Sequence, residues 1–227
     1  MRVKTRIVAV VIVMAGLGSA WLNASPLQEV EGATDLEKVE RARFRETYVN
    51  TAVDFTTYSK LYLGDAYFDY RDVGPARRYR SMGRTSSKSA FGITESDRKR
   101  FEDMVDKAFT NELSKAKRFE IVDTLGPGTI YMRGALVDIV SRVPPEFVGM
   151  SEVYLSSVGD ATLVMELLDG QTGEVLARVA ERGRIGSRSG FSGMPANSVT
   201  INSDVKRWAA QAARKLRKEL DDAMAGK

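Results

Sequence analysis

The 227-residue chain contains neither cysteine nor histidine. Without cysteine there is no disulfide framework, no thiol nucleophile and no cysteine-based zinc site. Without histidine there is no imidazole base, which excludes a Ser-His-Asp hydrolase. An enzyme built on this chain would have to use carboxylates, lysine, tyrosine or a carboxylate-bound metal. We therefore expect no catalytic residue, no metal site and no cofactor, and a non-enzymatic role is the favoured interpretation.

A long apolar run occurs only at the N-terminus. Three basic residues precede the uncharged run 7–22, and small residues follow it. This layout is typical of a secretory signal peptide, and the run is shorter than the ~20 residues that span a bilayer. We expect residues 1–24 to be a signal peptide cleaved after Ala20 or Ala24. An uncleaved N-terminal anchor is the alternative, and it would be the only membrane contact, since no cysteine is present to carry a lipid.

The basic character of the chain comes largely from this leader. The whole chain has 34 basic and 30 acidic residues, and three of the basic ones lie in residues 1–24. The remaining 31 basic and 30 acidic residues nearly balance. The isoelectric point of about 9.2 therefore does not indicate nucleic-acid binding, and we expect no nucleic-acid partner.

Hydrophobic periodicity predicts one domain over residues 48–227, joined to the leader by a polar tether over residues 25–47. We expect strands over residues 58–70, 118–123, 129–140, 160–169 and 174–182, and helices over residues 94–113 and 203–224. Two helices with one-sided apolar stripes need a sheet to lie on. The predicted fold class is α+β: a two-layer sandwich with a mostly antiparallel or mixed sheet of about five strands and two amphipathic helices packed on one face.

The two expected helices have clear apolar stripes. Thr94 is a good N-cap, with Asp97 three residues later. The first stripe comprises Phe101, Met104, Val105, Ala108 and Phe109, and the second comprises Val205, Trp208, Ala209, Ala212, Leu216 and Leu220. Both are interpreted as core. The stretch 183–199 before the second helix is expected to be a loop, because it is rich in Gly and Ser. It is not interpreted as a phosphate-binding P-loop, since the lysine and the Ser/Thr pair of that motif are missing.

The stretch LDGQTGEVLARV (168–179) allows two interpretations. Asp169, Thr172 and Glu174 could offer oxygen ligands to Ca²⁺, but three such residues are too few for a calcium site. The alternative is a hairpin turn, in which the Asp169 carboxylate accepts hydrogen bonds from backbone N–H groups and Gly173 adopts a left-handed conformation. The turn is the favoured interpretation.

A basic segment, residues 71–100, is the main candidate for a binding surface. It holds nine basic residues and three acidic ones. Such an excess can attract lipid headgroups, lipopolysaccharide or an acidic partner. The candidate anion or partner contacts are Arg77, Arg78, Arg80, Arg84 and Lys88. The alternative is a solvated face without a ligand.

Four blocks of the sequence carry a family resemblance. They are YVNTAVDFTTYSKLYL (48–63), LGPGTIYMRGALVDI (125–139), VGDATLVMELLDGQTGEVLARV (158–179) and VKRWAAQAARKLRKELD (205–221). In this order they resemble the bacterial Domain of Unknown Function 3313 family, small exported proteins often described as lipoproteins. Members typically have Pro-Gly where this chain has Thr51-Ala52, and often a lipidated cysteine that this chain lacks. The resemblance implies an envelope location and an α+β domain, and supplies no catalytic residues.

Three functions remain open. The favoured hypothesis is an exported, periplasmic or envelope-associated protein that acts as a non-catalytic binding or accessory module, with an envelope protein or an anionic envelope component as partner. The second is an anionic-surface binder acting through residues 71–100. The third is a carboxylate-dependent envelope hydrolase, which would need two carboxyl groups about 5–10 Å apart in a cleft.

Overall fold

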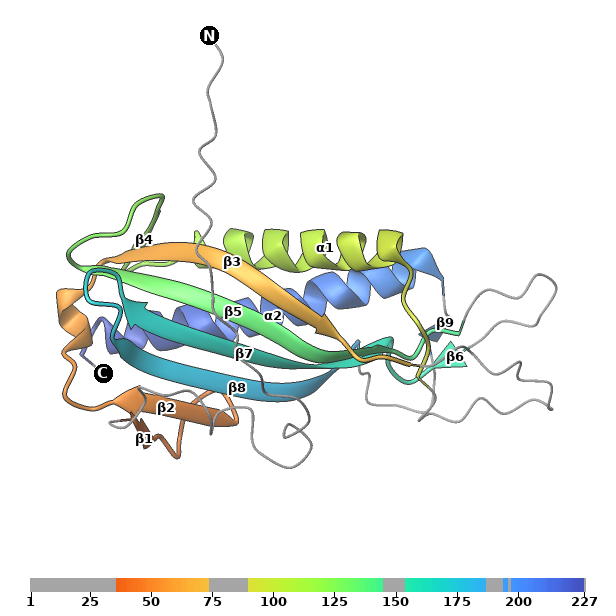
Figure 1. Ribbon diagram of the computed structural model, residues 1–227, viewed down its shortest axis with the longest axis horizontal. Coiled ribbons are helices and arrows are strands. Elements are labelled where there is room, and N and C mark those ends of the chain that lie inside the picture. The colour runs from red at the N-terminus through yellow and green to blue at the C-terminus, as the bar shows by residue number, and fades with distance from the viewer. Residues whose placement is uncertain (1–35, 74–89, 145–153, 187–193, 196, 227) are drawn as a thin grey trace, which may run out of the picture. The chain divides into compact units, whose positions relative to one another are not determined.

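The described domain pairs strands that lie far apart in the sequence. The computed structural model describes residues 36–73, 90–144, 154–186, 194–195 and 197–226. Its elements, in chain order, are β1 (Leu36–Lys38), β2 (Glu46–Asn50), the 3-10 turn η1 (Phe55–Thr57), β3 (Lys60–Tyr70), α1 (Glu95–Leu113), β4 (Glu120–Val122), β5 (Thr129–Ser141), β6 (Tyr154–Leu155), β7 (Gly159–Asp169), β8 (Val175–Ile185), β9 (Met194–Pro195) and α2 (Ser198–Ala223) (Figure 1).

The main sheet is mixed and has seven strands in the order β1-β2-β8-β7-β5-β3-β4. β3 pairs in parallel with both β4 and β5, whereas the other neighbours are antiparallel. β6 and β9 form a separate two-stranded ladder. The α+β class is confirmed, and the five expected strands correspond to β3, β4, β5, β7 and β8. The expected number of strands was too small, because β1 and β2 add two more.

β1 and the first two residues of β2 come from the segment expected to be a polar tether, residues 25–47. Glu46 to Val49 of β2 pair with β8, and β1 pairs with β2. Phe44, between them, is buried in the core. Residues 36–47 are therefore part of the sheet domain. Their sequence is polar because they form an edge of the sheet, where charged side chains such as Lys38 guard against further pairing.

The 168–179 stretch is a hairpin turn, as predicted. The Asp169 carboxylate accepts backbone hydrogen bonds from Gln171 (2.8 Å) and Thr172 (2.6 Å), and the Gly173 N–H donates to the Asp169 carbonyl (2.9 Å). Gly173 has φ +76°. The β7–β8 register shifts at Leu167 and Leu168, as expected for a bulged closure. Tyr58 also donates to Asp169 (2.8 Å), which ties η1 to the turn.

Asp169 and Tyr58 perturb each other's titration. Burial alone would raise the pKa of Asp169, but hydrogen bonds from Thr172, Tyr58 and Gln171 outweigh it and hold that pKa below its ordinary value. Burial, together with the hydrogen bond to Asp169, raises the pKa of Tyr58 to about 12. Asp169 therefore remains ionised at neutral pH and serves as an acceptor for the turn.

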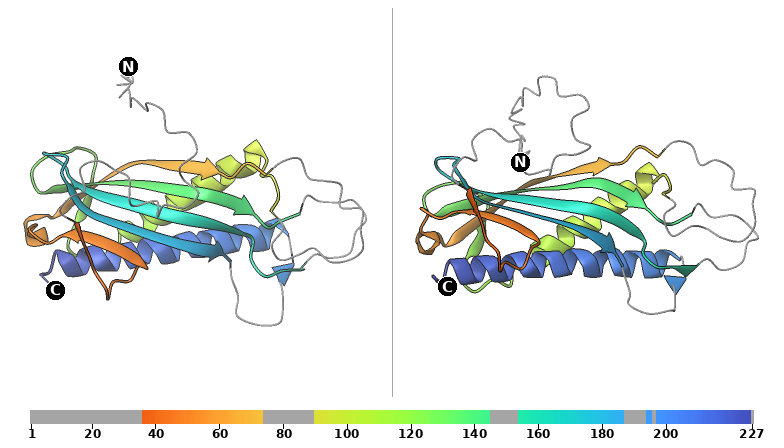
Figure 2. Two further views of the ribbon diagram at one scale, coloured as in Figure 1. Left: turned by 60° about the horizontal axis from the view of Figure 1, so that its bottom comes forward. Right: turned by 90° about the horizontal axis from the view of Figure 1, so that it is seen from below.

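Both helices lie on one face of the sheet (Figure 2). Thr94 caps α1, since its Oγ1 accepts from the Asp97 N–H (3.2 Å) and donates to the Asp97 carboxylate (2.7 Å). α2 begins at Ser198 rather than at residue 203, with Asn197 as its N-cap. The expected loop 183–199 is only partly correct, because β8 continues to Ile185, β9 covers Met194–Pro195 and α2 starts at Ser198. Residues 187–193 and 196 of that stretch lie outside the described residues.

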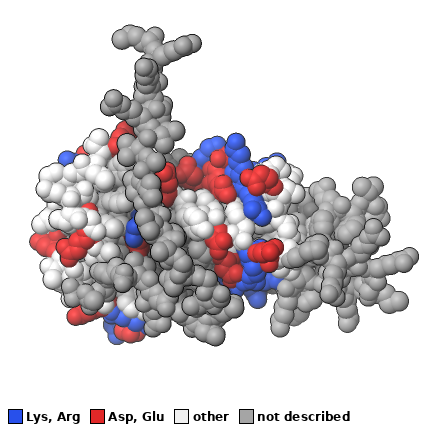
Figure 3. All heavy atoms as spheres, viewed as in Figure 1, with Lys and Arg blue, Asp and Glu red and all other residues white. Residues whose placement is uncertain are grey.

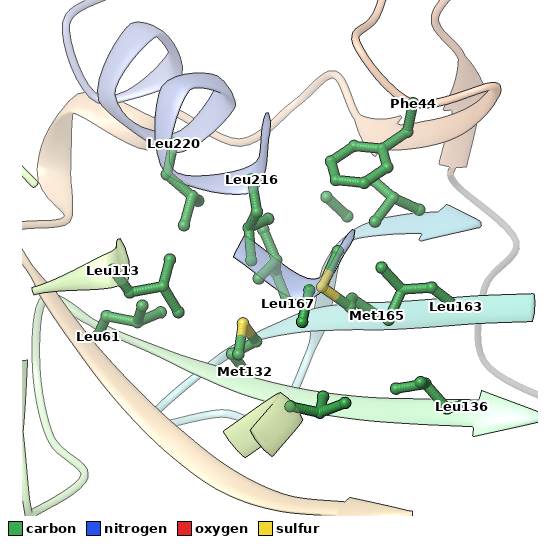
Figure 4. Close-up of a cluster of buried hydrophobic side chains, with 14 of the residues drawn as sticks. Phe44, Leu61, Leu113, Met132, Leu136, Leu163, Met165, Leu167, Leu216 and Leu220 are labelled. Carbon is green, nitrogen blue, oxygen red and sulfur yellow. The ribbon is translucent and has the colours of Figure 1, made fainter. Parts of the chain in front are cut away.

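The core lies between the helices and the sheet (Figure 4). Both predicted helical stripes face it, with Val105, Val205 and Leu216 buried. The strands contribute alternate side chains from β3, β5 and β7: Leu61, Met132, Leu136, Leu163, Met165 and Leu167. β5 lies in the interior of the sheet, between β7 and β3. This packing fixes the ends of the elements that form the site described below.

The opposite face of the sheet is charged. Acidic and basic side chains lie next to one another on the part of this face that is visible in Figure 3. Glu166 of β7 forms ion pairs with Arg133 of β5 and Arg178 of β8. Asp138, which has φ +57°, pairs with Arg71 and with Arg182 (3.2 Å). Glu166 therefore links adjacent strands, whereas the Asp138–Arg182 pair reaches from β5 across β7 to β8.

The expected signal peptide, residues 1–24, lies outside the described residues. None of the helices in the described part of the chain is long and apolar enough to cross a membrane.

Candidate functional site

A pocket of about 450 Å³ lies at one end of the helix–sheet core. It is bounded by the N-terminal turns of α1 and α2, by the C-terminal ends of β5 and β8, and by the start of β7. Its volume is within the range of about 300–1,000 Å³ that is usual for small-molecule sites. The pocket is therefore the best candidate for a functional site among the described residues.

The floor of the pocket is aliphatic. Five of the side chains that line it are buried: Ile139, Val140, Val158, Ile185 and Val205. Half-buried apolar side chains form the walls: Ile93, Phe101, Met104, Val143, Pro144 and Ile201. Such a lining favours an apolar ligand group, because burial of apolar surface stabilises a complex by about 25 cal/mol per Å².

Several backbone polar groups around this floor are already hydrogen-bonded within the protein. Val158 donates to the Ile185 carbonyl (2.9 Å) and accepts from the Arg142 N–H (2.9 Å). Ser141 accepts from the Phe91 N–H (3.0 Å). A polar ligand group placed against these atoms would lose its hydrogen bonds to water without full replacement, at a cost of roughly 1–3 kcal/mol.

The rim of the pocket is polar. Thr94, Asp97 and Arg100 come from the first turns of α1, and Ser198 and Asn202 come from α2. Asp97 is held by Thr94 and lies 3.7 Å from the Arg100 guanidinium. α2 has no acidic residue in its first turn, so no side chain of that turn offsets the positive end of its dipole.

The two helices are connected at the end away from the pocket. Glu112 of α1 lies 3.5 Å from Arg214 of α2, and Asp221 of α2 accepts the backbone N–H groups of Lys117 (2.9 Å) and Arg118 (3.0 Å). A hydrogen bond from Lys115, followed by one from Arg214, lowers the pKa of Glu112. Toward the pocket the N-terminal ends of the helices lie apart (Figure 2). The pocket occupies the space that this divergence leaves unfilled.

A smaller cavity of about 70 Å³ lies beside the main pocket, next to Tyr70 and Arg98. Tyr70 donates to Glu102 (3.0 Å), and the Arg98 guanidinium lies 4.6 Å from the Tyr70 ring centre. Burial and the hydrogen bond to Glu102 raise the pKa of Tyr70. These contacts join α1 to β3, so the cavity has a structural explanation.

The carboxylate arrangement that a hydrolase would need is not found in the described pocket lining, where Asp97 is the only carboxylate. Asp97 is held as the partner of Thr94 and Arg100. A glycosidase mechanism needs a second carboxyl group at a defined separation. The described geometry therefore gives the hydrolase hypothesis no support.

The sequence-predicted contact residues Arg77, Arg78, Arg80, Arg84 and Lys88 lie outside the described residues. Four other basic residues of the 71–100 segment are described, Arg71, Arg98, Lys99 and Arg100, and three of them contact a partner within the protein. Arg71 pairs with Asp138, Arg98 contacts the Tyr70 ring, and Arg100 lies near Asp97.

The pocket itself was not predicted from the sequence. Phe101, Met104 and Val205 were expected to be core residues. Val205 is part of the hydrophobic core, and Phe101 and Met104 pack against that core. Ile201 was missed because the second helix was expected to start after it. The spacing of Asn197, Ile201 and Val205 could have revealed it, since an asparagine N-cap followed by apolar residues four apart indicates a helix start.

Comparison with known proteins gives a family but no activity. The family model "Protein of unknown function (DUF3313)" matches residues 33–216. No curated protein matches the sequence.

Several solved structures are similar at low identity. A candidate neuraminyllactose-binding hemagglutinin homolog from Helicobacter pylori is 12% identical, with 75% of this chain and 86% of that chain covered and a TM-score of 0.38. A candidate lipoprotein from Caulobacter crescentus is 17% identical, with 56% of this chain and 86% of that chain covered and a TM-score of 0.34. The PelC dodecamer from Paraburkholderia phytofirmans is 10% identical, with 70% of this chain and 89% of that chain covered and a TM-score of 0.31. These identities and scores are too low to transfer a function.

Proposed function

The chain belongs to DUF3313, a protein family of unknown function, and we propose that it acts as an exported, non-catalytic binding module of the bacterial cell envelope. The pocket between the N-terminal turns of α1 and α2 is its ligand site. The observation that carries this proposal is a pocket of about 450 Å³ with an aliphatic floor and a polar rim. A pocket that is apolar inside with a few polar groups at its edge is the usual form of a small-molecule site.

The other parts of the proposal rest on the sequence and on chemistry. Export is supported by the basic residues, apolar run and small residues of the segment 1–24. A non-catalytic role is supported by the lack of cysteine and histidine and by the single carboxylate in the described pocket lining.

Native mass spectrometry of protein purified from the envelope fraction tests the proposal. The wild-type protein should carry a bound small molecule. Ile201→Trp places a large ring in the pocket and should remove the ligand. Val199→Trp is the matched control, because Val199 lies in the same turn of α2, is 77% exposed and does not line the pocket. A ligand retained by Ile201→Trp, or absent from the wild type, contradicts the proposal.

A second candidate function is binding to an anionic envelope surface through Arg77, Arg78, Arg80, Arg84 and Lys88. The net positive charge of residues 71–100 favours it. Co-sedimentation with phosphatidylglycerol vesicles should weaken when Arg77, Arg78 and Arg80 are all changed to alanine. Binding that is equally strong in the triple variant would rule this function out.

A further inference from the structure

We propose that the pocket binds a single aliphatic acyl chain, with the anionic end group of that ligand at the rim beside Arg100 and the first turn of α2. This inference rests on the proposed function, because it names the ligand class of the same site.

The floor selects against polar ligands. Its buried side chains are isoleucine and valine, and the Val158 N–H and carbonyl are both engaged in protein hydrogen bonds. A sugar or a nucleotide would bring hydroxyl or phosphate groups to atoms that cannot fully satisfy them. A hydrocarbon chain has no hydrogen bonds to lose.

The walls favour an aliphatic chain over a flat aromatic ligand. Phe101 is the one aromatic side chain in the described lining, and its ring is in edge contact with Phe68 and Tyr70. Apart from Pro144, the remaining wall residues, such as Met104 and Ile201, are flexible or branched aliphatic groups. Methionine adapts readily to irregular apolar shapes, which suits a chain with many rotamers.

The rim favours an anionic end group. The Arg100 side chain is about half exposed, and its guanidinium lies 3.7 Å from the Asp97 carboxylate, so further guanidinium donors can reach a ligand. The 26-residue helix α2 points its N-terminus at the same rim without an acidic residue in its first turn. A carboxylate or a phosphate there would gain from both the guanidinium and the helix dipole.

Fluorescence titration of the full chain with cis-parinaric acid, followed by displacement with dodecanoate, tests the inference. Wild type and Val199→Trp should bind both probes. Ile201→Trp should bind at least about tenfold more weakly, the factor expected when roughly two methylene groups lose their contact with the floor. Equal binding by Ile201→Trp and wild type, or no binding by wild type, overturns the inference.

The end group is tested separately. Arg100→Gln should weaken dodecanoate binding by about two- to fivefold, as for an exposed ion pair, and should leave 1-dodecanol binding unchanged. An equal loss for both compounds overturns the assignment of the anionic end. Competition by phosphatidylglycerol vesicles would identify membrane lipid as the source of the chain, whereas dodecanoate binding without such competition would identify free fatty acid.

Two controls keep the interpretation clear. Circular dichroism and melting curves establish that Ile201→Trp is folded, and Val143→Phe, which fills the pocket from the end of β5, serves if it is not. A different ligand found by native mass spectrometry and lost in Ile201→Trp, with no dodecanoate binding, would overturn the acyl-chain inference and retain the proposed function. Absence of any pocket-dependent ligand would overturn both.

Discussion

Glu166 is ion-paired with two arginines that differ greatly in burial. The contribution of each pair to the free energy of unfolding can therefore be predicted. The side chain of Arg178 is 3% exposed, that of Glu166 is 10% exposed and that of Arg133 is 46% exposed. Glu166→Gln keeps the shape of the side chain but leaves the buried Arg178 without the countercharge of Glu166. Breaking a buried pair from one side costs about 3–5 kcal/mol. Arg133→Ala removes an exposed pair and should cost at most about 1 kcal/mol.

Urea unfolding followed by circular dichroism measures both effects. Glu166→Gln should lower the urea midpoint strongly without changing the slope, and each kcal/mol should lower the melting temperature by about 2–4 °C for a domain of this size. The double variant Glu166→Leu with Arg178→Met should recover much of the loss, because both charges of the buried pair are replaced together by apolar side chains. The reasoning is refuted if Glu166→Gln costs less than about 1 kcal/mol, or if Arg133→Ala costs as much.

Three further predictions concern other parts of the domain. Gly173→Val should destabilise the domain by about 1–3 kcal/mol in urea unfolding through backbone strain alone, because a side chain there meets nothing within 4 Å; Gly126→Val, in equally open space at ordinary φ, is the control, and equal losses would contradict the argument. Thr94→Ala should lower the free energy of unfolding by about 0.5–2 kcal/mol through loss of the α1 N-cap, whereas Thr94→Ser should retain most of that stability. The pKa of Glu112 is lowered in the folded protein, so the stability that it contributes is present above its ordinary pKa of 4.5 and is lost as the pH falls through the lower folded value. The melting temperature measured from pH 6 to pH 3 should therefore fall less steeply for Glu112→Gln than for the wild type. An equal slope in the two proteins would contradict this.

The elements that local chemistry specifies were predicted well. The α1 helix carries its own N-cap in Thr94 and its own apolar stripe. The β7–β8 hairpin carries its own turn in Asp169 and Gly173. In each case the residues that determine the structure lie within a few positions of one another, so the sequence alone is sufficient to identify the element.

The elements that depend on distant partners were predicted poorly. β2 has little apolar alternation, and its pairing depends on the free edge that β8 offers more than a hundred residues later. The pocket is formed by the ends of five elements, from Ile93 to Val205, and none of these residues stands out in its own segment. Sequence patterns reveal which face of an element is buried, but not where two packed helices diverge.

The position of β2 also has a consequence for the order in which the chain can fold. Val49 pairs with Ala177, so the N-terminal edge of the sheet cannot close until most of the chain has been made available. Closing such a long loop is slow, because its entropic cost precedes the contacts that repay it. The β1–β2 hairpin therefore has no sheet edge to join until β8, in the last third of the chain, is available.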